Sequence, residues 1–292
     1  MTTWFITGAS SGLGAALAEA VLDHGDNAVV TARNAEHVAR FVEAHPDSAL
    51  AVPLEISDHH QVTAAVDAAT ERFGAIDVLV NNAGHGYRAA VEEAAVDEVD
   101  ELFAANFFGP VDLIKQVLPQ MRARRSGTII NVSSIGAPRS NPASGYYTAT
   151  KAALEGMSDA LNREVGPLGI RVMVIEPGAF RTDFSGRSLA QARTVIDDYA
   201  DTAGKRRKEN DRTHGTQQGD PDRAAQVIIS TVEGQELPFR LLLGSDAIEI
   251  VREELQGRID EIDKWAAVSA TTDFSATTDS SATTDFEAGD QS

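Results

Sequence analysis

Short apolar segments alternate with longer amphipathic segments along most of the chain. The short segments are rich in Val, Ile, Leu and Phe, and several are apolar almost throughout, as is typical of strands covered on both faces. The repeated order of strand, helix and strand predicts an α/β fold with a doubly wound, mainly seven-stranded parallel sheet and helices on both faces. The expected strands are Trp4–Thr7, Ala28–Thr31, Ala49–Leu54, Val78–Val80, Thr128–Val132, Val172–Ile175 and Phe239–Leu243, and the expected helices are Leu13–Leu22, Ala35–Ala44, His60–Phe73, Val96–Met121 and Tyr147–Val165.

Capping and breaking residues support these boundaries. Asp58 is suited to cap the helix after the third strand, and Gly74 is suited to end it. Gly166-Pro167 stops the helix that starts near Tyr147, since proline cannot continue it. Asp220-Pro221 predicts a further helix start, with proline at the first helical position.

Two regions depart from the alternating pattern. Residues 185–219 are polar and include the basic run Lys205–Lys208, which could attract an acidic substrate but is more typical of a solvated face. We expect this segment to be either a mobile substrate flap or a pair of short helices. Residues 268–292 contain a six-residue repeat with few apolar positions, which predicts a disordered acidic low-complexity tail. Residues 1–267 are expected to form a single domain.

Composition narrows the functional classes. The chain of 292 residues has no cysteine, which excludes disulfides and zinc–thiolate sites, and its seven histidines show no metal-binding spacing, so no metal is predicted. The formal net charge of −19 disfavours nucleic acid and anionic membranes as partners. No apolar segment approaches the ~20 residues of a membrane span, and the first residues lack the features of a signal peptide. A cytoplasmic protein is expected.

A glycine-rich turn, Thr7–Gly14, connects the first strand to the first helix. Glycines let the backbone approach a pyrophosphate closely, and the free amides at the helix start favour an anion. The alternative is an ordinary tight loop, but the strand before the turn and the helix after it are the context that a dinucleotide site requires.

The end of the second strand bears on cofactor preference. NAD enzymes usually have an acidic residue there for the ribose hydroxyls, whereas this chain has Ala32-Arg33-Asn34. Because Arg33 can pair with a 2′-phosphate, we expect NADP(H) to be preferred, with NAD(H) still possible. The alternative is that Arg33 is only a solvated surface charge.

A second cluster lies in the other half of the chain. Tyr147 and Lys151 are four residues apart in a helical segment and so share one face. Ser134 follows the fifth strand, at the carboxyl edge where open α/β sheets bind ligands.

Taken together, these motifs resemble the short-chain dehydrogenase/reductase family, in its compact single-domain branch of Rossmann-type enzymes. Within that branch the chain most resembles bacterial oxidoreductases grouped with hydroxysteroid dehydrogenases. The resemblance extends from Thr3 to about Leu243 in unbroken order. It rests on Thr7-Gly8-x-x-x-Gly12-x-Gly14, Asn81-Asn82-Ala83-Gly84, Asn106, Ser134, Tyr147, Lys151, Pro177-Gly178 and Thr182.

The resemblance implies hydride transfer between a nicotinamide cofactor and a carbonyl or secondary alcohol. Tyr147 would be the general acid and base, with its pKa lowered by the neighbouring Lys151. Lys151 would also bind the nicotinamide ribose, Ser134 would hold the substrate oxygen, and Asn106 would hold a proton-relaying water. Ser133 competes with Ser134 for its role, but the spacing favours Ser134, and Ser133 is expected to face the cofactor or satisfy the backbone.

The resemblance also implies the cofactor residues. Glu55 stands where many relatives have aspartate near the adenine, so its assignment is the least secure of the set. The expected set is Gly8, Ser11, Gly12, Leu13 and Gly14 at the pyrophosphate, Arg33, Glu55 and Ile56 toward the adenosine, Asn81, Asn82, Ala83 and Gly84 near its ribose, and Tyr147, Lys151, Pro177, Gly178 and Thr182 at the nicotinamide end.

Two other functions compete with an active reductase. One is a catalytically silent dinucleotide sensor, which would tend to lose the tyrosine and lysine. The other is a dehydratase or epimerase that keeps its cofactor bound, but such relatives have a different glycine spacing. The small-molecule substrate is expected to be lipophilic because Phe180, Phe184 and Leu189 lie in the variable region. A homodimer or homotetramer is expected from the family.

Overall fold

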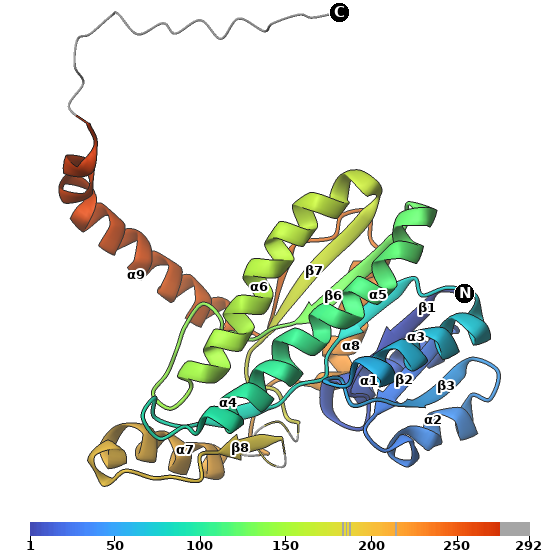
Figure 1. Cartoon of the computed structure of the whole chain (residues 1–292), viewed down its shortest axis with the longest axis horizontal. Coiled ribbons are helices and arrows are strands. Elements are labelled where there is room, and N and C mark those ends of the chain that lie inside the picture. Colours follow the sequence, from blue (N-terminus) through green and yellow to red (C-terminus); the bar gives the residue numbers. More distant parts are fainter. Residues whose placement is uncertain (183, 185, 187, 214, 275–292) are drawn as a thin grey trace, which may run out of the picture. The chain divides into compact units, whose positions relative to one another are not determined.

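The computed structural model describes residues 1–182, 184, 186, 188–213 and 215–274, and shows seven parallel strands in one sheet (Figure 1). The order β3-β2-β1-β4-β6-β7-β9 is that of a doubly wound sheet in which crossovers proceed outward in both directions from β1 and β4. It confirms the predicted fold class. The strands are β1 (Thr3–Ile6), β2 (Asn27–Ala32), β3 (Ala49–Pro53), β4 (Val78–Asn81), β6 (Gly127–Val132), β7 (Ile170–Pro177) and β9 (Arg240–Leu243).

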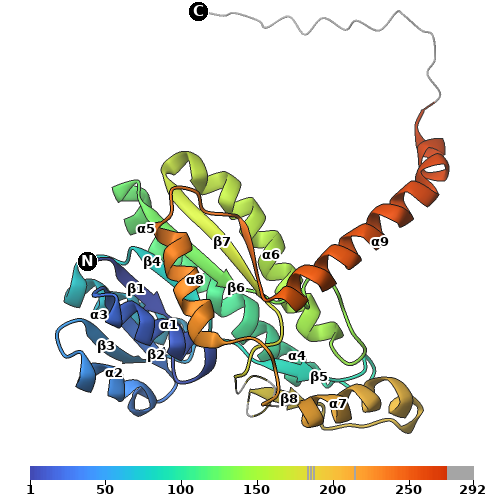
Figure 2. The ribbon, with the colours of Figure 1, turned by 180° about the vertical axis from the view of Figure 1, so that it is seen from behind.

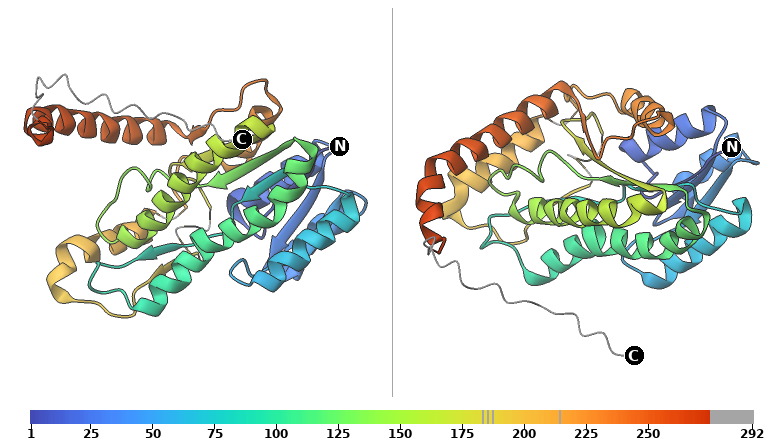
Figure 3. Two further views of the ribbon diagram at one scale, coloured as in Figure 1. Left: turned by 45° about the horizontal axis from the view of Figure 1, so that its top comes forward. Right: turned by 90° about the horizontal axis from the view of Figure 1, so that it is seen from above.

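Helices cover both faces of this sheet, as Figures 2 and 3 show. Alternate residues of each strand face opposite layers. In β1, Trp4 and Ile6 pack in one apolar core, and Phe5 packs in the other. The first core is covered by α1 (Gly12–Asp23), α2 (Ala39–Ala44) and α8 (Pro221–Glu233), and the second by α3 (His59–Phe73), α5 (Gly109–Arg124) and α6 (Gly145–Val165).

The predicted caps are present. The Asp58 carboxylate accepts hydrogen bonds from the backbone N–H groups of His60 and Gln61, and Gly74 ends α3 with a positive φ of 83°. Asp220 caps α8 in the same way. Helix α6 stops at Val165, directly before the glycine–proline pair. Local capping chemistry therefore set these boundaries correctly.

The single helix expected over Val96–Met121 is divided. Helix α4 (Val96–Phe103) is followed by one π-helical turn (Ala104–Phe108) and then by α5. A Cβ atom on Gly109 would lie 2.5 Å from the carbonyl oxygen of Ile56, so the helix passes that loop too closely for any side chain. The wider turn places Asn106 in the interior.

The expected flap of residues 185–219 has defined elements, although Ser185, Arg187 and His214 lie outside the described residues. Strand β8 (Leu189–Gln191) pairs in parallel with β5 (Gly86–Arg88), and neither strand was predicted. A 3₁₀ turn (Asp197–Tyr199), a π turn (Ala200–Gly204) and α7 (Lys205–Thr213) follow. The solvated face expected for the basic run is wrong for Arg207. Its guanidinium is buried against Glu93, with N···O distances of 2.7 and 3.0 Å.

The chain divides into two compact units, Met1–Arg252 and Glu253–Ser292. Helix α9 (Ser245–Ser269) begins in the first unit and continues into the second, where a 3₁₀ turn covers Ala270–Thr272. The expected low-complexity tail therefore begins as helix, and residues 275–292 of it lie outside the described residues. No helix in the described part of the chain has both the length and the apolar character needed to cross a membrane.

The buried ion pair between Arg207 and Glu93 should hold the segment that contains α7 in place, and a substitution can test this. Substituting Arg207→Met leaves a buried carboxylate without its cation, and breaking a buried pair in this way costs roughly 3–5 kcal/mol. Because the Glu93 carboxylate also accepts the backbone N–H groups of Ala90 and Ile196, we expect residues 196–208 to lose protection from amide hydrogen exchange.

The control is Lys205→Met, which removes an exposed charge two residues away in α7 and should leave the exchange rates unchanged. In the wild type, Arg207 and, to a smaller extent, the backbone N–H groups of Ile196 and Ala90 outweigh burial and lower the pKa of Glu93 from 4.5 to about 2. The contribution of the pair to stability is therefore complete above pH 4.5 and is lost as the pH falls toward 2. Equal protection in Arg207→Met and wild type at neutral pH would contradict this account.

Candidate active site

Two loops meet at the carboxyl edge of the sheet, one after β1 and one after β4. The Thr7 hydroxyl accepts hydrogen bonds from the backbone N–H groups of Asn82 and Ala83, both at 2.9 Å. The Asn82 amide donates to the carbonyl oxygens of Thr7 and Gly8, at 2.8 and 3.1 Å. Gly8 has a φ of 68°, and a Cβ atom there would lie 2.9 Å from Cα of Ala83. Only glycine allows the two loops to approach this closely.

The start of α1 fits a pyrophosphate. Ser11 precedes the helix, and its side chain forms no capping hydrogen bond. The first-turn amides of Gly12, Leu13 and Gly14 therefore lack a capping acceptor from this residue. Such amides, together with the positive end of the helix dipole, bind phosphate groups.

The residues expected to bind the adenosine differ in whether their polar groups already have partners within the protein. Arg33 follows β2, is exposed, and has no hydrogen bond or ion pair with the described residues. The Glu55 carboxylate accepts hydrogen bonds from the backbone N–H and the hydroxyl of Ser57, at 3.4 and 3.0 Å. Ile56 is buried, and its carbonyl lies against the helix start at Gly109.

Asn81 is directed into the sheet. Its side-chain amide is buried and donates to Oδ1 of Asn131 at 2.8 Å, and the Asn131 amide donates to the Ser158 hydroxyl at the same distance. A ribose could therefore meet only the backbone of Asn81, whereas Ala83 and Gly84 form the turn beyond it.

The expected nicotinamide residues follow β7. Pro177 ends this strand, and the backbone N–H of Gly178 donates to the carbonyl oxygen of Leu243 at 2.9 Å. Thr182 lies over the glycine-rich turn, since a Cβ atom on Gly12 would be 3.2 Å from Cβ of Thr182. An open cavity of about 300 Å³ adjoins Gly12, Thr182 and Arg40, at the pyrophosphate end of the site.

Tyr147 is buried in the first turn of α6, and its ring and the Ser134 hydroxyl lie side by side, since a Cβ atom on Gly136 would be 3.2 Å from Oγ of Ser134 and 3.4 Å from the Tyr147 ring. Ser134 also accepts the backbone N–H of Gly136 at 2.9 Å. Burial raises the pKa of Tyr147, and this effect outweighs the lowering by the Ser134 hydrogen bond and by the charge of Arg88. The phenol is therefore protonated at neutral pH.

Lys151 lies one turn further along the same face of α6. Its Nζ atom donates to the carbonyl oxygen of Val132 at 2.9 Å and lies 6.0 Å from the ring centre of Tyr147. Burial lowers the pKa of Lys151 to about 8, although the negative charge of Glu155 acts in the opposite direction. The Lys151 amino group is thus held close to the tyrosine, and it loses its proton more readily than an ordinary lysine does.

Asn106 is fully buried behind Lys151. Its Oδ1 atom accepts the backbone N–H of His85, and its amide donates to the His85 carbonyl and to the Thr150 hydroxyl, at 3.0 to 3.2 Å. A Cβ atom on Gly84 would meet both Oδ1 of Asn106, at 2.9 Å, and Nζ of Lys151, at 3.6 Å. The structure therefore brings together Asn106, Ser134, Tyr147 and Lys151, the four residues that the sequence singled out.

Ser133 differs from the expectation. It neither faces the glycine-rich turn nor satisfies the backbone with its side chain, because its hydroxyl donates to Oε1 of Glu155 at 2.6 Å. Arg240 contacts the other oxygen of Glu155 at 3.4 Å and also lies 3.5 Å from buried Glu176. Burial and the charge of Glu155 raise the pKa of Glu176 to about 7.

The sequence analysis missed Glu155 and Arg88 as neighbours of the site. Glu155 follows Lys151 by four residues, and that helical spacing could have placed both on one face. Arg88 gave no such signal, because its position depends on the unpredicted strand β5. Tyr146 packs edge-on against Tyr87, and its hydroxyl donates to the Val91 carbonyl, so this neighbour of Tyr147 is a packing aromatic.

The family model for short chain dehydrogenases matches residues 2–193. Oxidoreductase BOA17 of Botryotinia fuckeliana is 38% identical over 267 residues, which cover 91% of this chain and 97% of that protein. A short-chain dehydrogenase structure from Streptomyces avermitilis has a TM-score of 0.87 and 39% identity, covering 94% of this chain and all of that one. A metagenomic short-chain oxidoreductase solved with NADP has a TM-score of 0.65 and 26% identity, covering 83% and 96%.

The fold and the matched motifs define an oxidoreductase with an NAD(P)-binding Rossmann fold. The chain belongs to the short-chain dehydrogenase/reductase family.

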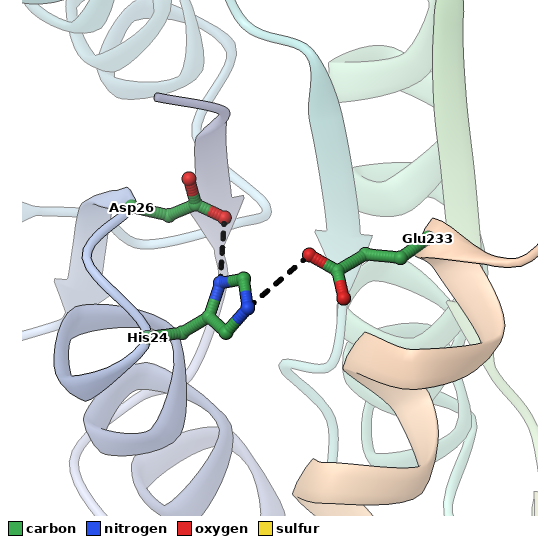
Figure 4. Close-up of side chains that lie close together, drawn as sticks. All are labelled: His24, Asp26 and Glu233. Atoms are coloured by element: carbon green, nitrogen blue, oxygen red, sulfur yellow. Dashed lines mark hydrogen bonds and ion pairs between the residues drawn. The ribbon is translucent and has the colours of Figure 1, made fainter.

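A cluster of potential metal ligands lies at the opposite edge of the sheet (Figure 4). Nδ1 of His24 is 3.4 Å from Asp26, and Nε2 is 3.3 Å from Glu233. The two ring nitrogens thus face different carboxylates, which is the geometry of a histidine bridging two acidic side chains. The cluster joins the end of α1 to the end of α8.

The electrostatic effect of Glu155 on Lys151 can be tested directly. Because the carboxylate raises the pKa of Lys151, we expect Glu155→Gln to move that pKa below its wild-type value of about 8. The measurement is an NMR titration of ¹³C-labelled lysine, with the Lys151 signal assigned from a Lys151→Met variant. Asp159→Asn, one turn further along α6, should leave the titration unchanged. An identical curve for Glu155→Gln and wild type would refute the coupling.

Proposed function

We propose that the protein is an NADP(H)-dependent oxidoreductase that transfers a hydride between the nicotinamide and a carbonyl or secondary alcohol. In the reducing direction, the ketone, NADPH and one proton give the secondary alcohol and NADP⁺. The observation that carries the proposal is the buried Tyr147 phenol, which lies beside the Ser134 hydroxyl and one helical turn from Lys151 at the carboxyl edge of the sheet.

In this proposal Tyr147 donates its proton to the substrate oxygen as negative charge develops there. Burial keeps the phenol protonated, which is the form that reduction requires. Ser134 donates a hydrogen bond to the same oxygen and fixes the carbonyl. A bound nicotinamide cofactor would supply the hydride, and the residues that would orient its ring and the carbonyl would contribute much of the remaining rate.

The reverse direction needs the phenolate. A neighbouring cation favours that form, and Lys151 is the buried cation nearest to the ring along α6. We propose that Lys151 also binds the nicotinamide ribose, and that Asn106 holds a water through which Lys151 exchanges its proton with solvent. The burial of Asn106 and its fixed hydrogen bonds to His85 support a positioning role.

The glycine-rich turn and the uncapped start of α1 support binding of a dinucleotide pyrophosphate. Arg33, exposed and free of described partners, supports a preference for the 2′-phosphate of NADP(H) over NAD(H). The metagenomic relative solved with NADP is consistent with a nicotinamide cofactor. The four assembled residues argue against a silent sensor, which has no need of a buried tyrosine and lysine in register.

Removal of the phenol tests the catalytic proposal. Tyr147→Phe should lower NADPH oxidation with a panel of aldehydes and ketones by roughly 10²–10⁴-fold, because the proton donor is lost. NADPH binding, measured by the fluorescence of the reduced nicotinamide, should be retained. The matched control is Tyr146→Phe, whose hydroxyl bonds only to the Val91 carbonyl and whose loss should leave turnover intact. Full activity in Tyr147→Phe would refute the assignment.

Arg33→Ala tests the cofactor preference. A charge-assisted contact of about 1.5–3 kcal/mol predicts a loss of NADPH affinity of roughly tenfold to a hundredfold. The affinity for NADH serves as the internal control and should not change, since NADH has no 2′-phosphate. If Arg33→Ala weakens both cofactors equally, or neither, the role given to Arg33 is wrong.

A further inference from the structure

We propose that Arg88 and Arg206 bind an anionic group of the substrate, and that the natural substrate is a ketone or secondary alcohol bearing a carboxylate. This inference rests on the proposed function and specifies its substrate class. It depends on Arg88, a buried cation near Tyr147 with no carboxylate partner among the described side chains, and on the neighbouring Arg206, whose Nε atom has no hydrogen-bond partner.

Arg88 is the last residue of β5 and is only 8% exposed. Its guanidinium donates to the carbonyl oxygen of Tyr87 at 3.2 Å, and its Nε atom is buried without a hydrogen-bond partner. A buried cation is costly unless it is paired and hydrogen-bonded. Other arginines of this region do have carboxylates, since Arg207 contacts Glu93 and Arg193 contacts Asp97 at 2.6 Å.

Arg206, on α7, is partly exposed and paired with Glu209, but it shares one feature with Arg88. Its Nε atom is also buried without a hydrogen-bond partner, and its guanidinium lies 3.6 Å from Glu209. Burial and the like charge of Arg206 lower the pKa of Arg88 to about 10, so Arg88 stays charged at neutral pH. Two neighbouring cations with unused donors repel each other, and a carboxylate between them would remove that repulsion and accept their N–H groups.

Arg88 lies close to the proposed reacting centre. The charge of Arg88 acts on the Tyr147 phenol and lowers its pKa, and Tyr147 raises that of Arg88 in return. The ring of Phe184 lies 5.7 Å from that of Tyr147. A Cβ atom on Gly86 would lie 2.6 Å from Leu189 and 3.3 Å from Phe184, so these apolar side chains cover β5 as well.

The arrangement specifies where each part of a substrate lies. Its carbonyl oxygen lies at Tyr147 and Ser134, its apolar body against Phe184 and Leu189, and its carboxylate at Arg88 and Arg206. The lipophilic substrate expected from the sequence is therefore amended to an amphipathic one. A neutral ketone would leave the buried guanidinium unpaired, which a site of this kind rejects.

Two matched ketones test the proposal. The probes are 4-oxo-4-phenylbutanoate and its methyl ester, which differ in one negative charge, and the measurement is kcat/KM for their reduction by NADPH. We expect the wild type to prefer the acid by tenfold or more. Arg88→Met should lower kcat/KM for the acid roughly tenfold to a hundredfold more than for the ester, which feels only the loss of the Arg88 charge at Tyr147. Arg88→Lys, which keeps the charge, should recover part of the preference.

A binding measurement separates this inference from the proposed function. Calorimetry with 4-phenylbutanoate, which has no carbonyl, requires no turnover. Binding to wild type that is lost in Arg88→Met supports the anion site even if no ketone is reduced. Reduction of the ester without a preference for the acid, and without binding of 4-phenylbutanoate, overturns the anion site while the reductase proposal stands.

Two controls exclude simpler explanations. Arg193→Met removes an exposed arginine of the same segment that already has a carboxylate partner, and should change neither probe. An equal loss of activity toward acid and ester in Arg88→Met would show that Arg88 only supports β5, and would overturn the proposal. Competition by inorganic sulfate and phosphate as strong as that by 4-phenylbutanoate would overturn the commitment to a carboxylate.

Discussion

The parallel pairing of the strands is the constraint on which the rest of the molecule depends. Because each strand of the central sheet runs in the same direction, each of them ends at the same edge, and every return connection must cross a face of the sheet. The crossovers bury both faces, and the edge collects the loops that follow β1, β4, β6 and β7. Thr7, the Asn81–Gly84 turn, Ser134 and Pro177 come together for this reason.

Burial then determines the chemistry of the groups at that edge. Tyr147 and Lys151 are both nearly inaccessible, so burial favours the protonated phenol and the deprotonated amine. The neighbouring charges act in the opposite direction. The negative charge of Glu155 raises the pKa of Lys151, and the positive charge of Arg88 lowers the pKa of Tyr147. The phenol is therefore held in its protonated form, whereas Lys151, with a pKa of about 8, can gain or lose its proton near neutral pH.

The sequence predicted the features that depend on local patterns. Apolar runs located the seven strands, Asp58 and Asp220 marked helix starts, and the four-residue spacing of Tyr147 and Lys151 placed them on one face. Features that depend on distant segments were missed. These features are the β5–β8 pair, the π turn at Asn106 and the contact between Arg207 and Glu93. None of them follows from the local periodicity of apolar residues. Arg88 was overlooked because a single arginine after a motif resembles any surface charge.

The most direct test of hydride transfer follows the transferred hydrogen atom itself. NADPH labelled with deuterium at the transferred position of C4 is incubated with the protein and a carboxylate-bearing ketone, and the alcohol product is analysed by mass spectrometry and NMR. The account predicts one deuterium on the carbon that was the carbonyl, in step with cofactor oxidation. An alcohol without deuterium, or bound NADPH that is never oxidised by any ketone of the panel, would contradict hydride transfer as the function of this site.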